Sequence, residues 1–293
     1  PWFYLLAVGL LVAVMLVGVG AKGAQRWLSV GGFRFQPAEI MKLVLPLTIA
    51  WYLADRSLPP RFFPIAVTLV LLGVPAVLIL QQPDLGTALL IAASGLFVLF
   101  MAGMGWTYIL GAAALAMAAS WPMWMFVLKD YQKQRILTLL DPEADKLGAG
   151  WNIIQSKTAI GSGGWDGKGW TLGTQSHLDF LPESHTDFII AVLSEEFGLR
   201  GVLVLMAIYL MILLRGFWIG INASSSFGRM MAGSLTLTFF VYIFVNMGMV
   251  AGLLPVVGVP LPLVSAGGTS LISLMAAFGI LMAVSTEKSA GPR

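Results

Sequence analysis

Long apolar runs separated by polar segments dominate this chain, and they predict membrane-spanning helices. A helix needs about 20 apolar residues to cross roughly 30 Å of hydrocarbon. Small residues inside several runs, such as Gly73, Gly95, Gly111 and Gly233, allow close packing of such helices. The pattern therefore predicts an all-α polytopic membrane protein with about eight spans. These spans cover residues 2–20, 37–54, 64–80, 86–103, 107–128, 199–219, 230–252 and 268–286.

One long hydrophilic segment, residues 129–187, interrupts this pattern and holds most of the acidic residues. Loops longer than about 15 residues are usually either functional or disordered. This segment contains large apolar residues, among them Trp151, Ile153, Trp165 and Trp170. We therefore expect it to fold as one large ordered loop on one side of a single membrane domain, residues 1–293.

The apolar run after this loop is too long for one crossing. At 1.5 Å per residue, a helix over residues 185–220 would reach about 54 Å. Gly198 and Gly201 predict a break. Residues 186–197 would then form a short half-helix at the membrane surface, where irregular backbone needs surrounding protein or a wet cavity.

Composition supports a lipid-facing protein and excludes several kinds of site. Of the 293 residues, 58% are hydrophobic and only 11% are charged, with a mean hydropathy of +0.87. Soluble domains carry about 25% charged residues. The absence of cysteine excludes disulfides and thiolate chemistry, and two histidines make a multi-histidine metal site improbable. The net charge of +3, with scattered basic residues, gives no indication of nucleic acid binding.

Charged loop residues give a weak orientation signal. With residue 1 on the cytoplasmic side, the positive-inside rule is satisfied by the inner loops. The outer side then holds Lys22, Arg26, Arg34 and the large loop, which oppose the rule. An anionic ligand outside the membrane would explain them. The inner cations are Arg56, Arg61, Arg215, Arg229, Lys288 and Arg293.

Glu39 and Lys42 form the first of three polar clusters in apolar surroundings. They lie three residues apart, so they share one face of a helix, and Pro37 suits the first turn of that helix. A charge near the centre of a membrane helix costs about 2.5–3.5 kcal/mol on insertion scales. Either the two form an interfacial ion pair that offsets its own desolvation, or they line a ligand site.

Asp84 lies in the second cluster, the sequence Gln-Gln-Pro-Asp-Leu-Gly-Thr between two predicted spans. Aspartate is a favoured N-cap residue. A capping role for Asp84 and a ligand-binding role are compatible, and the sequence leaves both open.

The third cluster, around His185 and Asp187, joins the large loop to the membrane. Asp187 precedes the apolar run Phe188–Leu193, and a partly buried carboxylate there suits a general base. N-capping by Thr186 or Asp187 is the structural alternative. Glu195 follows two turns later on nearly the same helix face. It is either a second functional carboxylate or the partner of a cation such as Arg200.

The glycine-rich segment 161–169 is not a nucleotide-binding loop. It lacks the Walker A spacing, the Ser or Thr after Lys168 and a preceding strand.

Several motifs, in order and with compatible spacing, resemble the SEDS family (shape, elongation, division and sporulation). They are KGAQRW, FQPAEIMK, QPDLGT, DYQKQR, LDPEADKLGAGWNIIQSKTAIGSGGWDGKGW, GTQSHLDFLPESHTDFIIAVLSEEFG and NMGMVAGLLPVVGVPLPLVSAGGTS. The segments around residues 153–170 and 173–188 look more like the elongation members than the division members. Trp151, Trp165-Asp166 and His177 depart from the usual pattern, and none of them touches the Asp187 motif.

The resemblance implies a membrane enzyme of about ten helices, so we expect the first two helices to precede Pro1. It implies polymerisation of lipid II outside the bacterial cytoplasmic membrane, with Asp187 as the essential aspartate. It also implies important roles for Glu39 and Lys42, and it matches Asp84 and Arg26 to family motifs. A class B penicillin-binding transpeptidase and the elongation machinery are the implied partners.

The implied chemistry fits these residue types. The donor is a glycan on undecaprenyl diphosphate, and a sugar hydroxyl of lipid II attacks it with Asp187 as base. Cations must meet the leaving diphosphate, and the candidates are Arg26, Lys42, Lys133 and Arg135. Mg²⁺ or Mn²⁺ could assist, with Asp187 as a candidate ligand, and no organic cofactor is expected. His185 and Glu195 are further candidates for supporting the site.

Two other functions fit parts of the sequence. In a lipid II flippase, Glu39, Lys42 and Glu195 would line a path, although no inverted repeat is visible. A scaffold that only recruits a transpeptidase would tolerate substitution of Asp187. Inverting glycosyl transfer is the function that the motifs favour.

Overall fold

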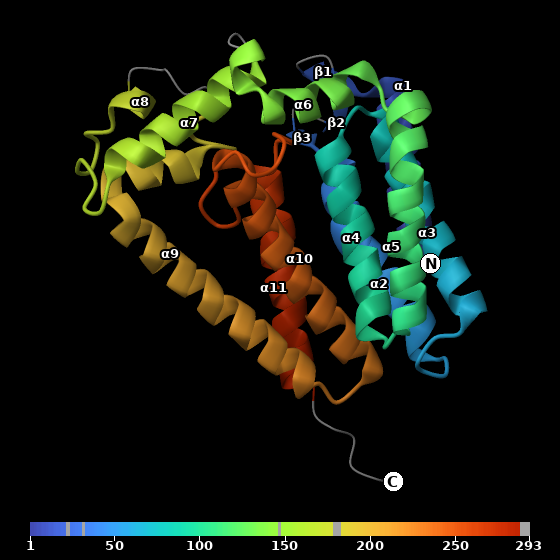
Figure 1. Ribbon diagram of the computed structural model, residues 1–293. Coiled ribbons are helices and arrows are strands. Elements are labelled where there is room, and N and C mark those ends of the chain that lie inside the picture. Colours follow the sequence, from blue (N-terminus) through green and yellow to red (C-terminus); the bar gives the residue numbers. More distant parts are fainter. Residues whose placement is uncertain (22–23, 31–32, 146–147, 178–182, 288–293) are drawn as a thin grey trace. The chain divides into compact units, whose positions relative to one another are not determined.

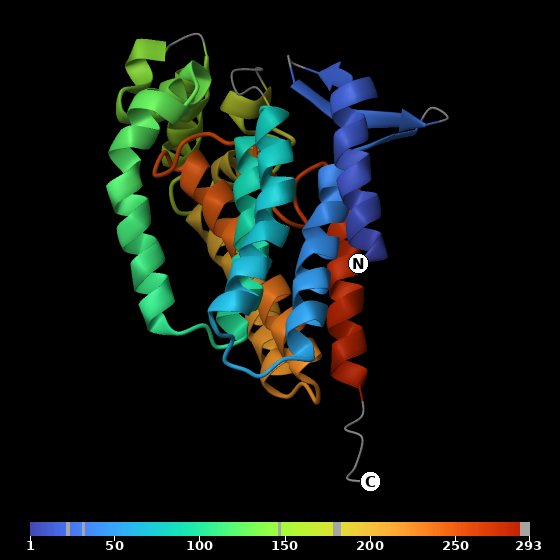
Figure 2. The ribbon, with the colours of Figure 1, turned by 90° about the vertical axis from the view of Figure 1, so that its right-hand side faces the viewer.

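The predicted spans are all helical in the computed structural model, which describes residues 1–21, 24–30, 33–145, 148–177 and 183–287. Lys22, Lys288 and Arg293, named above as loop cations, lie outside the described residues. The spans correspond to α1 (Trp2–Val17), α2 (Pro37–Ala54), α3 (Phe62–Gln81), α4 (Leu85–Met101), α5 (Trp106–Pro122), α9 (Ile189–Ile221), α10 (Ser226–Val250) and α11 (Gly268–Thr286). Figures 1 and 2 show these helices from two sides.

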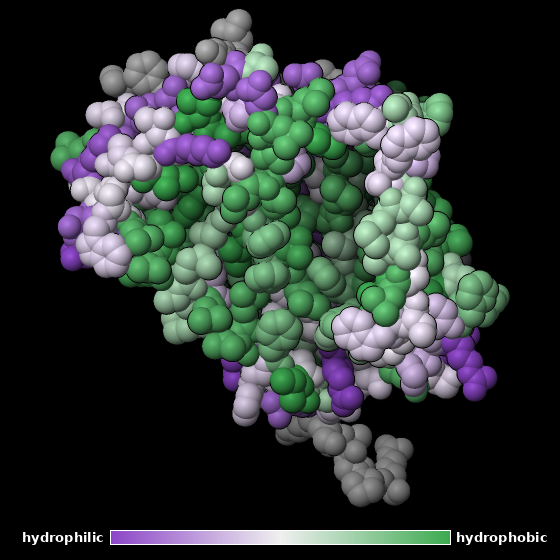
Figure 3. All heavy atoms as spheres, in the orientation of Figure 1, coloured by the Kyte–Doolittle hydropathy of each residue, from purple (hydrophilic) through white to green (hydrophobic). Residues whose placement is uncertain are grey.

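Apolar surface covers these helices, as expected for a multi-pass membrane protein. Six described helices are long and apolar enough to cross a membrane, and α1 and α4 are shorter apolar helices. None of α5 is buried within the molecule, and it continues as a π-helix over Met123–Val127. Figure 3 shows apolar side chains over the middle of the visible helices and hydrophilic side chains near helix ends. The predicted helical, polytopic fold class is confirmed.

A small antiparallel sheet between α1 and α2 was not predicted from the sequence. Its strands are β1 (Val19–Ala21), β2 (Ala24–Val30) and β3 (Phe33–Phe35), in that order. Where β2 pairs with β3, Leu28 lies opposite Phe35, and Ser29 lies opposite Arg34. Figure 2 shows the strands beside the upper end of α1. The sheet fixes the course of the chain just before α2.

The described part of the chain divides into two compact units. Unit 1 comprises Pro1–Met104, Ile212–Val241 and Gly267–Arg293. In unit 1, α2 packs against α1, α3, α4 and α11. Its core contains the fully buried side chains of Leu11, Met41, Leu45, Ile49 and Leu99. The Ser234 hydroxyl of α10 donates to the main-chain oxygen of Ser94 in α4 at 2.8 Å.

Unit 2 comprises Gly105–Met211 and Tyr242–Ala266, and it contains the large polar loop. The described part of the loop forms α6 (Asp130–Leu140), a 3₁₀ turn (Pro142–Asp145), α7 (Ala149–Gly163) and α8 (Thr174–His177). The buried Ser156 of α7 donates to the main-chain oxygen of Val250 at 2.9 Å. This bond ties α7 to the end of α10.

The predicted break in the long apolar segment lies at Gly198. Its φ of 64° interrupts α9 and divides it into a short first part and a spanning second part. The glycine-rich segment 163–169 covers the break. The main-chain nitrogens of Lys168 and Gly169 donate to Glu195 and Glu196, and those of Leu199 and Arg200 donate to Gly164 and Trp165. Every one of these groups lies within unit 2.

Glycine is required on both sides of this contact. A Cβ atom on Gly163 would overlap the main chain of Ser194, and one on Gly198 would overlap Gly167 and Trp165. The glycines that resemble a phosphate-binding loop in sequence therefore allow two backbones to approach closely.

Candidate functional site

Glu39 and Lys42 form a buried ion pair near the start of α2. Pro37 occupies the first turn of this helix, and Lys42 Nζ lies 2.7 Å from Glu39 Oε1. Ser273 of α11 donates its hydroxyl to the other carboxylate oxygen, Oε2, at 2.7 Å. The ion pair that the sequence left as one of two alternatives is present, and Ser273 is a partner that sequence reasoning missed. Because Glu39 is only 8% exposed, these bonds offset the cost of burying its charge.

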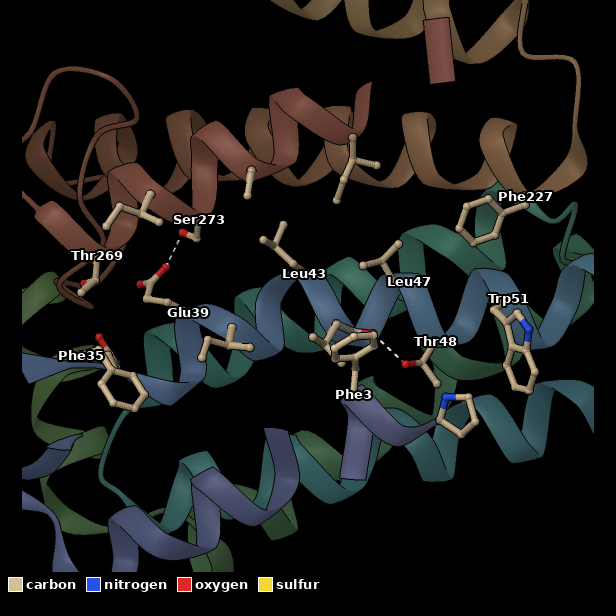
Figure 4. Close-up of a pocket in the computed structure, with 17 residues that line it drawn as sticks. Phe3, Phe35, Glu39, Leu43, Leu47, Thr48, Trp51, Phe227, Thr269 and Ser273 are labelled. Atoms are coloured by element: carbon tan, nitrogen blue, oxygen red, sulfur yellow. Dashed lines mark hydrogen bonds between the residues drawn. The ribbon is translucent and has the colours of Figure 1, made fainter. Parts of the chain in front are cut away.

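A groove of about 800 Å³ runs along α2 beside this pair. Figure 4 shows Glu39 and Ser273 near one end with Phe35 and Thr269, and Trp51 and Phe227 near the other. Most of its other lining side chains are apolar, including Leu43 and Leu47. An apolar groove with one polar end suits a lipid-borne ligand better than a free sugar.

Arg26 and Asp84 meet at a second polar contact in unit 1. Arg26, on β2, lies with Nε 3.6 Å from Asp84 Oδ2, and its Nη2 donates to the Pro83 main-chain oxygen at 2.6 Å. Asp84 caps α4 by accepting from the Thr87 main-chain nitrogen, so the predicted cap is confirmed. Gln36 donates to Asp84 at 3.3 Å and also lines the groove, so it connects the two polar contacts.

Asp187 is half-buried and belongs to unit 2, where it directly precedes the buried Phe188. Its main-chain oxygen accepts from Asn246 Nδ2 at 2.8 Å. A Cβ atom on Gly258 would lie 3.4 Å from Asp187 Oδ2, so the carboxylate lies against a residue without a side chain. The family motifs also lead us to expect that Asp187, Glu39, Lys42 and Arg26 converge on one cavity open to the outer leaflet, and this stays a prediction.

The neighbours of Asp187 bond mainly through their main chain. His185 is exposed, and its main-chain oxygen accepts from the Ala266 nitrogen at 2.9 Å. The Thr186 hydroxyl donates backward to Glu183 Oε2 at 2.9 Å.

Glu195 is fully buried, and its ionic partner differs from the expected one. Lys168 Nζ lies 2.6 Å from Glu195 Oε1, whereas Arg200 pairs with the exposed Asp166. The prediction of Arg200 as partner was wrong, because the glycine-rich segment folds back across the break and brings Lys168 to Glu195. The main-chain nitrogens of Thr174 and Gln175 and the Thr174 hydroxyl also donate to this carboxylate.

Lys133 and Arg135 both lie on α6 and are partly exposed. The Arg135 guanidinium lies 5.8 Å from the centre of the Tyr131 ring. Residues two apart on a helix face different directions. These two cations therefore cannot bind one small anion from the same helix face.

A metal site formed only by side chains is not assembled in the described part of the chain. No group of three or more His, Cys, Asp or Glu residues there is arranged to hold an ion. Asp187 would need further ligands from a bound substrate to hold Mg²⁺ or Mn²⁺.

Sequence reasoning missed the residues that hold Asp187, which come from the end of α10 and from the α10–α11 connector. The last motif quoted for the family resemblance, residues 246–270, contains Asn246, Gly258 and Ser265, but no role was assigned to them. Asn246 is completely buried in an otherwise apolar stretch of α10, and this isolated polar residue was the available signal for such a role. Lys157 of α7 is another cation of unit 2 that was missed, and its side chain lies against Gly252.

The fold and these polar contacts define a polytopic helical membrane protein with a loop-borne carboxylate and a buried acid–base pair beside an apolar groove. Residues 1–290 match the model of the cell cycle protein family that comprises FtsW, RodA and SpoVE. The chain therefore belongs to this family, which is the SEDS family indicated by its motifs.

Named relatives are similar over almost the whole chain. The peptidoglycan glycosyltransferase MrdB of Escherichia coli K12 is 56% identical over 289 residues, covering 98% of this chain and 78% of MrdB. A probable peptidoglycan glycosyltransferase FtsW of Geobacter metallireducens is 42% identical, covering 97% and 76%. The higher identity with MrdB agrees with the predicted resemblance to elongation members.

Solved structures share the fold. A chain from a structure described as "structural coordination of polymerization and crosslinking by a peptidoglycan synthase complex" matches with a TM-score of 0.83 and 32% identity. The match covers 97% of this chain and 79% of that one. The rod shape determining protein RodA of Thermus thermophilus matches with a TM-score of 0.69 and 28% identity, covering 97% and 76%.

Proposed function

We propose that this peptidoglycan glycosyltransferase polymerises lipid II at the outer face of the bacterial cytoplasmic membrane, with Asp187 as general base. The observation that carries the proposal is the position of Asp187. Its half-buried carboxylate lies where the polar loop joins an apolar helix, and it lies against Gly258, which presents no side chain. We propose that a substrate hydroxyl reaches the carboxylate at this junction.

The proposed reaction is a single displacement. The sugar 4-hydroxyl oxygen of lipid II bonds to the anomeric carbon of the donor glycan, and its proton passes to Asp187. The bond from that carbon to the diphosphate oxygen breaks, and its electron pair leaves with undecaprenyl diphosphate. One displacement converts an α-linked donor into a β-linked product, so no covalent enzyme intermediate is needed.

Cations must stabilise the negative charge that develops on the leaving diphosphate. In this proposal Arg26 and Lys42 serve that purpose, with Lys133 or Arg135 as a further contact. Each of Arg26 and Lys42 is held by a carboxylate, Asp84 and Glu39 respectively. These bonds fix the cations in place before substrate binds. We propose that His185 and Glu195 support the loop around Asp187, and that Mg²⁺ or Mn²⁺, if required, binds together with substrate.

We also propose a partner. The chain matched at a TM-score of 0.83 comes from a complex described as coordinating polymerisation and crosslinking. We infer that this protein works with a class B penicillin-binding transpeptidase within the cell-elongation machinery. Such a partner would crosslink the strands that this chain polymerises.

Polymerisation from purified lipid II by the Asp187→Ala variant tests the central claim. General base catalysis contributes about 10²- to 10⁴-fold, so we expect a rate loss in that range with lipid II binding retained. The assay presents lipid II on the outer face of reconstituted vesicles, where an enzyme makes polymer and a flippase makes none. A wild-type rate from a well-folded Asp187→Ala protein would remove Asp187 from the mechanism.

A further inference from the structure

The main chain around Asp187 is held by the end of α10 and by the α10–α11 connector that follows it, both in unit 2. Three successive main-chain oxygens accept from these two segments. The His185 oxygen accepts from the Ala266 nitrogen at 2.9 Å, the Thr186 oxygen from the Ser265 hydroxyl at 2.5 Å, and the Asp187 oxygen from Asn246 Nδ2 at 2.8 Å.

Asn246 is the centre of this arrangement. Its amide nitrogen donates one hydrogen to Asp187 and the other to the Val259 main-chain oxygen at 2.7 Å. Both partners are carbonyls, so the amide has only one acceptable orientation. A completely buried amide in an apolar helix costs free energy unless it is bonded. The two bonds from its nitrogen offset part of this cost.

The connector itself is rigidly held. The Leu261 nitrogen donates to the Ser265 hydroxyl at 2.8 Å, so this hydroxyl both donates and accepts. The buried Tyr209 of α9 donates to the Pro262 main-chain oxygen at 2.7 Å. Gly258, at a φ of 73°, then brings bare backbone against the Asp187 carboxylate.

We infer that Asn246 and Ser265 are positioning residues for Asp187. They bond to the main chain of residues 186 and 187 and thereby fix where the carboxylate points relative to Gly258. Displacement of a reacting group by about 1 Å can cost roughly 100-fold in rate. The inference rests on the proposed function, because it assigns these two residues a task in that reaction.

The test measures lipid II polymerisation by the full-length protein with Asn246→Ala, Ser265→Ala or Ser265→Thr. We expect kcat to fall about 10- to 100-fold in both alanine variants, while KM changes less than about threefold because substrate contacts remain. Ser265→Thr keeps the hydroxyl and should restore most of the rate. Ser234→Ala is the matched control. Ser234 lies in α10, as Asn246 does, and the substitution removes a buried hydrogen bond from its hydroxyl to the Ser94 main-chain oxygen. We expect it to leave kcat unchanged.

The outcomes separate the two proposals. If Asp187→Ala is inactive but both alanine variants keep wild-type kcat, the positioning inference is overturned and the proposed function stands. If Asp187→Ala keeps full activity, the proposed role of Asp187 as base is overturned, and the positioning inference that rests on it is overturned as well. A fall in thermal midpoint with unchanged kcat per folded molecule would also overturn the inference. Should Asn246→Ala not fold, the Ser265→Ala and Ser265→Thr pair decides the question alone.

Discussion

Glu195 is fully buried, and its two oxygens accept from Lys168, Thr174 and Gln175. A carboxylate enclosed by donors has little reason to take up a proton. Glu195 is therefore suited to a structural role rather than to that of a base. Asp187, eight residues earlier, is half-buried just before α9.

Removing the Lys168 charge should therefore damage stability. Breaking one side of a buried ion pair costs about 3–5 kcal/mol, and Lys168 is 28% exposed while Glu195 is 0% exposed. We expect Lys168→Met to lower the thermal unfolding midpoint in detergent by several degrees. Asp166→Asn is the control, because this exposed ion pair with Arg200 should contribute only about 0–1 kcal/mol. Equal midpoints for the two variants would contradict a buried role for the pair.

At the scale of elements, the break in α9 depends on glycine. Gly198 has a φ of 64° and a ψ of −165°, a backbone conformation that essentially only glycine adopts and that costs other residues on the order of 1–3 kcal/mol. A side chain there would also collide with Trp165 in the facing loop. We expect Gly198→Ala to lower the thermal midpoint clearly.

The matched control for this substitution is Gly161→Ala in α7. Nothing lies within 4 Å of a Cβ atom at Gly161, and alanine is favoured over glycine in a helix by about 0.5–1 kcal/mol. The midpoint should therefore stay the same or rise. A Gly198→Ala protein as stable as Gly161→Ala would show that the loop does not hold the break.

Elements defined by local pattern could be predicted from the sequence. The spans follow from apolar runs, the break from an excess of length, and the Asp84 cap from residue type. The strands β1 and β3 have only three residues each, too few to produce a recognisable alternation.

Contacts between distant residues could not be read in the same way. Arg200 is close to Glu195 in sequence, yet Lys168, 27 residues away, is its partner. Asn246 reaches Asp187 across 59 residues. Nothing local encodes such pairings, since they exist only once the loop and the connector have folded.

At the scale of the whole molecule, the candidate residues divide between the two units. Arg26, Glu39, Lys42 and Asp84 belong to unit 1, whereas Asp187 and Glu195 belong to unit 2. The helices α9 and α10 run from one unit into the other. The participation of the unit 1 residues in the proposed reaction stays a prediction.

The proposed orientation can be tested because the chain has no cysteine. Thr158 is exposed on α7, in the loop region that contacts the first part of α9, and Ser224 is exposed just beyond the other end of α9. A membrane-impermeant maleimide added to intact cells should label Thr158→Cys and leave Ser224→Cys unlabelled until the membrane is opened. Labelling of Ser224→Cys alone would place Asp187 on the cytoplasmic side and exclude the proposed reaction.

The break at Gly198 also bears on how deep in the membrane the residues just before it lie. The part of α9 after it, residues 199–221, is about 34 Å long at 1.5 Å per residue, which matches the hydrocarbon layer of roughly 30 Å. On the proposed orientation, residues 187–197 would then lie at headgroup level. A polyprenyl lipid whose tail stays among the acyl chains carries its diphosphate at that same level. The enzyme would not have to lift its substrate out of the bilayer, and the growing strand could leave directly into water.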